Sequence, residues 1–130
     1  MLIGLAGEAG SGKSYAANRL IERHNFVCVK MADPLKNMLR ALGLTDAHIE
    51  GALKETPCDI LCGATPRHAM RTLGTEWGRD IIHQKLWTSL FAKTVRAVPA
   101  TQHVVCDDVR FADEAAAIRA VGGQDRKSVV

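Results

Sequence analysis

Residues 7–14, GEAGSGKS, constrain the fold of this chain more than any other stretch of the sequence. They match the pattern G-x-x-x-x-G-K-[ST], which forms a phosphate-binding loop when a buried strand precedes it and a helix follows it. The apolar run MLIGLA precedes the loop, and SYAANRLIERHN, which has helical periodicity, follows it. We therefore expect a strand, a phosphate-binding loop and a helix at the start of the chain, rather than an ordinary glycine-rich turn.

The residue types in this loop suit a polyphosphate. Glycines allow the backbone to approach phosphate oxygens closely, and the start of the helix directs N–H groups and a partial positive charge at one point. Lys13 adds a charge, and the Ser14 hydroxyl is a ligand for Mg²⁺. The residues predicted to bind the polyphosphate are Gly7, Ala9, Gly10, Ser11, Gly12, Lys13 and Ser14.

Length and composition favour one soluble domain over residues 1–130. The chain is 47% hydrophobic and 24% charged, as is typical of globular proteins. No apolar run approaches the roughly 20 residues of a membrane span, and the chain begins with a strand rather than a signal segment, so we expect a cytoplasmic protein without a membrane partner. The net charge is only +3, and the Lys and Arg residues are scattered along the chain rather than clustered, which argues against nucleic acid as a partner.

Strand-like and helix-like segments alternate along the sequence. We expect strands at residues 1–6, 26–31 and 103–108, and helices at 14–25, 32–43, 65–80, 85–97 and within 109–123. Residues 44–64 are less regular, with a possible short helix at 44–52. This alternation predicts an α/β fold, a short parallel sheet flanked by helices, with ligands at the carboxyl ends of the strands.

Acidic residues follow two of the predicted strands. Asp107 and Asp108 end the apolar segment HVVCDD, a position that suits Mg²⁺, although either aspartate could instead cap the next helix. Asp33 follows the second strand, where a carboxylate would orient or deprotonate an attacking group. A purely structural role remains open for Asp33, because an aspartate before Pro34 is also a good N-cap.

Basic and aromatic side chains follow on the predicted helix 65–80. Arg67 and Arg71 are four residues apart and share a helical face, and Arg79 lies further along. Arginine forks suit phosphate oxygens, but a solvated basic face is the alternative. Trp77 would either stack on a base or fill the core.

Taken together, GEAGSGKS, MADPLK, TPRHAMRTLGTEWGRD and CDDVRFADEAAAIRAVGG resemble the deoxynucleoside monophosphate kinases of bacteriophages and prophages, within the P-loop nucleoside monophosphate kinase group. The LGTEWGR and DVRF segments are far more specific than the phosphate-binding loop. The resemblance covers nearly the whole chain and is poorest at residues 44–56 and in the tail 124–130. It implies a three-layer P-loop NTPase fold and transfer of the γ-phosphoryl group of ATP to a deoxynucleoside 5′-monophosphate with Mg²⁺.

The resemblance also implies roles for individual residues. Lys13 and Ser14 would handle the ATP phosphates and Mg²⁺, Asp108 would be the metal-facing acid, and Arg71 would contact the acceptor or the transferring phosphate. The further residues that it places around the acceptor are Asp33 and Lys36 at the border of the site, Glu76, Trp77 and Arg79 in the sugar and base pocket, and Arg110 at the end of the third strand. Among these, Lys13, Asp33, Arg71 and Asp108 would be catalytic.

Relatives of this type continue past the glycine pair at 122–123 into another strand, a basic lid and an adenine-binding segment. Only QDRKSVV follows here, so we expect a truncated chain in which the C-terminal strands and the lid are missing. The alternatives to an active kinase are an impaired nucleotide-binding remnant and another P-loop kinase related to dephospho-coenzyme A kinase. A sheet without its last strand would leave an unpaired edge that a homodimer would cover.

Overall fold

The computed structural model describes residues 1–7, 12–122 and 124–127. The chain divides into two compact units. The sheet unit comprises the described residues of Met1–Met31 and Thr88–Val130, and the helical unit comprises Ala32–Trp87. The prediction of a single kinase-like domain over residues 1–130 stays a prediction.

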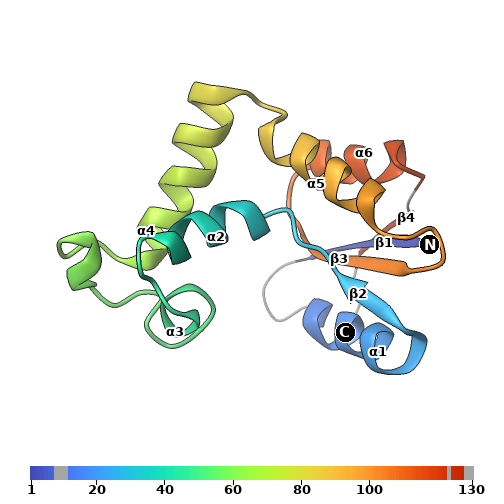
Figure 1. Cartoon of the computed structure of the whole chain (residues 1–130), viewed down its shortest axis with the longest axis horizontal. Coiled ribbons are helices and arrows are strands. Elements are labelled where there is room, and N and C mark those ends of the chain that lie inside the picture. The colour runs from blue at the N-terminus through green and yellow to red at the C-terminus, as the bar shows by residue number, and fades with distance from the viewer. Residues whose placement is uncertain (8–11, 123, 128–130) are drawn as a thin grey trace. The chain divides into compact units, whose positions relative to one another are not determined.

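The sheet unit contains, within the described residues, one sheet of four strands in the order β2–β3–β1–β4, all paired in parallel (Figure 1). These strands are β1 (Leu2–Ala6), β2 (Phe26–Cys28), β3 (His103–Val109) and β4 (Gln124–Lys127). The predicted α/β fold, a short parallel sheet flanked by helices, is confirmed. The three strands expected from the apolar runs all form, each within a few residues of its predicted position.

Helices cover both faces of this sheet, as Figure 1 shows. The helix α1 (Lys13–His24) packs on one face, where Ala17 meets Leu5, Phe26 and Val105. The helices α5 (Leu86–Ala97) and α6 (Ala112–Ala120) supply Phe91 and Ile118 to the other face. Successive side chains of a strand point to opposite faces, so the apolar run at 104–106 supplies core residues to both layers.

One expectation about the end of the chain is wrong. Residues 124–127 were expected to form no strand, yet β4 pairs in parallel with β1, from Ile3 opposite Gln124 to Ala6 opposite Lys127. The sequence QDRK has none of the apolar alternation by which strands are recognised. It joins the sheet because α6 and the turn at Gly122 (φ 87°) return the chain to the edge of β1.

The helical unit is built from short helices. These are α2 (Asp33–Ala41), α3 (Asp46–Ile49), the 3₁₀-helix η1 (Asp59–Leu61), α4 (Pro66–Arg71) and the π-helix η2 (Thr72–Ile82). The start of α4 is as predicted, with Pro66 at the first position and the Thr65 hydroxyl accepting the His68 N–H at 3.1 Å. Among the described residues, no helix is long and apolar enough to cross a membrane.

The helix predicted over residues 65–80 changes character halfway. It is α-helical to Arg71 and then becomes the π-helix η2, at whose end the His83 N–H donates to the Gly78 carbonyl at 3.0 Å. π-Helical hydrogen bonds join residues i and i+5, and such segments are rare and concentrated at functional sites. The whole LGTEWGR segment lies in this π-helix.

A substitution at Gly4, in the middle of β1, tests the packing between the sheet and α6. A Cβ added there would collide with Ile118 Cδ1 and lie 3.3 Å from Val109 Cγ2. We expect Gly4→Ala to lower the free energy of unfolding by about 1–3 kcal/mol through overpacking. Ile118→Val deletes the colliding methyl, so the double variant should lose less than the sum of the two single losses. Strictly additive losses in chemical denaturation would contradict this packing.

Candidate functional site

The predicted phosphate-binding loop ends in a turn that requires glycine. Gly12 adopts the left-handed conformation (φ 91°) at the N-cap of α1, and the helix begins at Lys13. No acidic side chain lies in the first turn, so the positive end of the helix is not offset within that turn. Lys13 is half-buried and Ser14 is exposed. The predicted phosphate ligands Ala9, Gly10 and Ser11 lie outside the described residues.

The two aspartates of β3 lie at a β-bulge beside β1. Gly4 pairs with Cys106 and Ala6 with Val109, so Leu5 on β1 faces two residues, Asp107 and Asp108, on β3. A bulge redirects side chains locally and is over-represented next to active sites. Because side chains alternate along β3, the two consecutive carboxylates are held by different partners at the same end of the strand.

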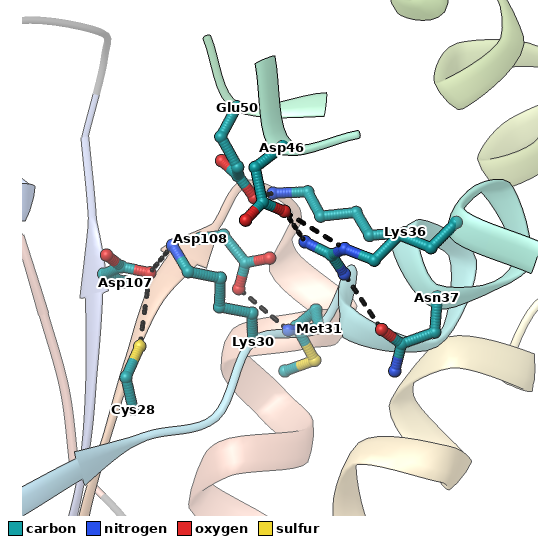
Figure 2. Close-up of polar contacts among 10 residues, drawn as sticks. Cys28, Lys30, Met31, Lys36, Asn37, Asp46, Glu50, Asp107 and Asp108 are labelled. Atoms are coloured by element: carbon teal, nitrogen blue, oxygen red, sulfur yellow. Dashed lines mark hydrogen bonds and ion pairs between the residues drawn. The ribbon is translucent and has the colours of Figure 1, made fainter. Parts of the chain in front are cut away.

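Asp107 is held by a lysine. Its Oδ1 accepts a hydrogen bond from Lys30 Nζ at 2.8 Å and lies 3.9 Å from the Cys28 thiol, and its side chain is only 11% exposed (Figure 2). Cys28 packs against the core cluster under α1. Asp107 is therefore turned toward the face of the sheet that carries the phosphate-loop helix.

Asp108 is held by the backbone instead. Its Oδ1 accepts the Met31 N–H at 2.9 Å (Figure 2) and the Cys106 thiol at 3.1 Å. Met31 and Cys106 belong to the core cluster under α5 and α6. Burial, followed by the charge of Asp108, raises the pKa of the Cys106 thiol, so this thiol stays protonated and donates.

The alternative in which these aspartates cap the next helix is wrong. The N-terminal end of α6 is satisfied by Glu114, whose Oε1 accepts the N–H groups of Arg110 and Phe111 at 2.8 and 3.0 Å. Asp107 and Asp108 both remain inside β3. Arg110, predicted to bind substrate, directly follows this strand and is exposed.

The first turn of α2 carries Asp33 and Lys36. Ala32 occupies the N-cap position and Asp33 is the first helical residue, so the N-cap hypothesis for Asp33 is wrong. Lys36 is largely buried, and its Nζ contacts Glu50 Oε1 at 2.6 Å. This ion pair ties α2 to the chain that follows α3 and fixes the lysine close to the start of α2.

Arg71, at the end of α4, lies in an exposed group of polar side chains. Its guanidinium is 3.5 Å from Glu76 Oε1 and 3.4 Å from His68 Nδ1, and the Arg71 and Glu76 side chains are each 60% exposed. Exposed pairs at this separation contribute little to stability. The Arg71 guanidinium can therefore exchange Glu76 for a stronger anionic partner at little cost.

An apolar groove of about 500 Å³ lies beside this group, entirely within the helical unit. It is lined by Met38, Leu39, Leu42, Leu61, Ala69, Thr72, Leu73, Glu76, Trp77 and Ile81. Trp77, predicted either to stack on a base or to fill the core, thus lines a groove and remains 37% exposed. Arg79, on the same π-helix, is half-buried.

The predicted site residues fall into two groups. Residues 12–14 with Asp108 and Arg110 belong to the sheet unit. Asp33 and Lys36 belong to the helical unit together with the residues between 71 and 79. That both groups bind the same two nucleotides, ATP and the acceptor, stays a prediction.

A curated relative decides the family. A protein of Acanthamoeba polyphaga mimivirus named "Putative deoxynucleotide monophosphate kinase" is 40% identical to this chain over an alignment of 136 positions, which covers 95% of this chain and 70% of the relative. This chain belongs to the deoxynucleotide monophosphate kinase family. No protein-family model matches the chain. The assignment to the phage and prophage branch of these kinases stays a prediction.

Lys30, which is not among the residues predicted from the sequence, forms an ion pair with Asp107 near the end of β3. Burial alone would lower its pKa, but the hydrogen bond and charge of Asp107, with smaller contributions from Cys28 and Asp108, raise it. A lysine pKa raised by folding stabilises the folded state at all pH values below the unfolded pKa of about 10.4. This stabilisation is lost as the pH rises through the folded pKa.

Lys30→Met tests this contact. The variant leaves the nearly buried Asp107 carboxylate without its cation, so we expect the free energy of unfolding at neutral pH to fall by about 1–3 kcal/mol. The loss should shrink as the pH rises from about 10.4, where Lys30 of the unfolded chain loses its proton, through the raised pKa of Lys30 in the folded chain. Denaturation at several pH values measures both effects, and Lys93→Met, at an exposed position of α5, is the control. Equal small losses in both variants would refute the proposed stabilisation.

Proposed function

We propose that this chain transfers the γ-phosphoryl group of ATP to a deoxynucleoside 5′-monophosphate, giving the deoxynucleoside diphosphate and ADP. An oxygen of the acceptor phosphate would attack the γ-phosphorus while the bond to the β,γ-bridging oxygen breaks. One observation carries the proposal, namely the glycine turn that opens α1 at Lys13, beside a strand whose parallel neighbour carries two aspartates near its carboxyl end. The name of the mimivirus relative points to the same reaction class.

The ATP phosphates are assigned to the start of α1. Backbone N–H groups of the loop, from Gly7 to Gly12, would bind the phosphate oxygens, and the Lys13 ammonium would neutralise their charge. Phosphoryl transfer depends mainly on positioning the reactants and on neutralising charge, and these N–H groups and the ammonium would supply both. The absence of acidic side chains in the first turn, within the described residues 13–16, favours an anion at this point.

The donor atoms in the sheet unit fit Mg²⁺. This ion prefers oxygen ligands and is usually held by one or two carboxylates together with substrate phosphates. The exposed Ser14 hydroxyl and the Asp108 carboxylate would hold it, and Asp107 is the second candidate acid. When bound, Mg²⁺ would neutralise the charge of the transferring phosphoryl group. Among the described residues, no group of three or more His, Cys, Asp or Glu residues lies close enough to hold a metal, so substrate phosphates would complete the ligand set.

The acceptor is assigned to the helical unit. A phosphate can form two parallel hydrogen bonds with the Arg71 guanidinium, which outcompete its exposed contact with Glu76 at 3.5 Å. Asp33 and Lys36 would border this phosphate. The apolar groove, with Glu76 and Trp77 in its lining, offers a flat aromatic side chain to the base, and Arg79 and Arg110 would assist in binding the substrate.

The test is an ADP-release assay with ATP, Mg²⁺ and a panel of acceptors. The panel contains each deoxynucleoside 5′-monophosphate, the ribonucleotides and dephospho-coenzyme A. We expect ADP to appear only with a deoxynucleotide acceptor, and Lys13→Ala to lower the rate by about 100-fold or more, because a charge contact to the transferring group is removed. The control Lys93→Ala changes an exposed lysine of α5 and should retain full activity.

Two results would contradict the proposal. No turnover above the Lys13→Ala background with any acceptor would refute kinase activity, and ATP binding detected by calorimetry in that case would indicate a binding protein. Turnover with dephospho-coenzyme A alone would assign the chain to a different substrate.

A further inference from the structure

The π-helix η2 determines which side chains line the apolar groove. Thr72 and Trp77, five residues apart, both line it. Glu76 and Ile81 form a second such pair. In an α-helix, residues five apart point about 140° away from each other. In a π-helix they are joined by the i→i+5 hydrogen bond and lie on the same side.

Trp87 makes two specific contacts with this π-helix. Its Nε1–H donates to the Gly74 carbonyl at 2.7 Å. Its ring packs against Gly78 so closely that a Cβ added there would lie 2.5 Å from Cζ2 and from Nε1. Trp87 is itself 5% exposed. Its ring centroid is 6.3 Å from that of Trp77.

These contacts act at the two points where η2 is weakest. Gly74 and Gly78 lack side chains, so each costs the helix about 0.5–1 kcal/mol relative to alanine. A π-helix rarely extends beyond one turn, yet η2 covers 11 residues. Support from outside the helix is therefore needed, and Trp87 provides it at both glycines.

We propose that Trp87 is a positioning residue that holds η2 in its i→i+5 register and so places Glu76 and Trp77 in the groove. The importance of the groove for the acceptor nucleotide rests on the proposed function. The hold of Trp87 on η2 does not depend on that function. Trp87 acts only through η2 and is not assigned a contact with the nucleotide.

Trp87→Phe keeps a buried aromatic ring but removes the Nε1–H donor. Hydrogen–deuterium exchange followed by mass spectrometry measures the effect on residues 72–83. We expect amide exchange in this segment to accelerate about 10-fold, because the Gly74 carbonyl loses its buried partner. The KM for the acceptor should rise by a similar factor, whereas the KM for ATP should stay unchanged.

A second variant examines the close contact. Gly78→Ala places a methyl group against the indole, so it should also accelerate exchange in residues 72–83. The indole atoms that it meets are Cζ2, Nε1 and Cε2, and the smaller phenylalanine ring does not extend to the position of Cζ2. Adding Gly78→Ala to Trp87→Phe should therefore have a much smaller effect than it has in the wild type.

Phe91→Leu is the control for a general loss of stability. Phe91 is 2% exposed in the core of the sheet unit, and its truncation should lower the melting temperature without accelerating exchange in residues 72–83. Unchanged exchange in Trp87→Phe, or equal acceleration in Phe91→Leu, would overturn the proposal. Faster exchange with an unchanged acceptor KM would overturn the link to the groove. A wild type without kinase activity would refute the proposed function, and the exchange data would still decide the role of Trp87.

Discussion

The parallel pairing of β1 with β3 is the constraint on which the candidate site depends. It places the glycine turn after β1 and the aspartates of β3 at the same edge of the sheet, because parallel strands end together. The alternation of side chains along β3 then turns two neighbouring carboxylates, which would otherwise repel each other, toward different partners. One is held by the Lys30 ammonium, and the other by the Met31 N–H, so neither negative charge is left without support.

Much of this arrangement could be predicted from the sequence, because it follows from local patterns. The loop glycines and the apolar runs predicted β1, α1 and β3, and Pro66 after Thr65 predicted the start of α4. The two acidic groups predicted at the carboxyl end of the third strand, Asp107 and Asp108, lie near the end of β3. The pattern could not tell which partner each aspartate has, since Lys30 is far from Asp107 in sequence and is no part of a recognised motif.

The features that sequence reasoning missed depend on contacts between distant residues. A strand of sequence QDRK forms because β1 has an open edge beside it, and not because of its own residues. The change from α-helix to π-helix at Thr72 is likewise invisible to apolar periodicity, which indicates a helix without fixing its register. Gly74, Gly78 and Trp87 were the available signal in the sequence, but their role is visible only in the contacts that Trp87 makes with the two glycines.

The central claim is that the turn at Lys13 and the guanidinium of Arg71 serve one phosphoryl transfer. A crystal structure with a bisubstrate analogue, two nucleosides joined through their 5′ positions by a chain of phosphates, tests it most directly. The account predicts that Lys13 and Arg71 both lie within hydrogen-bonding distance, about 3 Å, of the same phosphate chain. A complex in which the phosphates lie away from Lys13, or in which Arg71 points away from them, would contradict it.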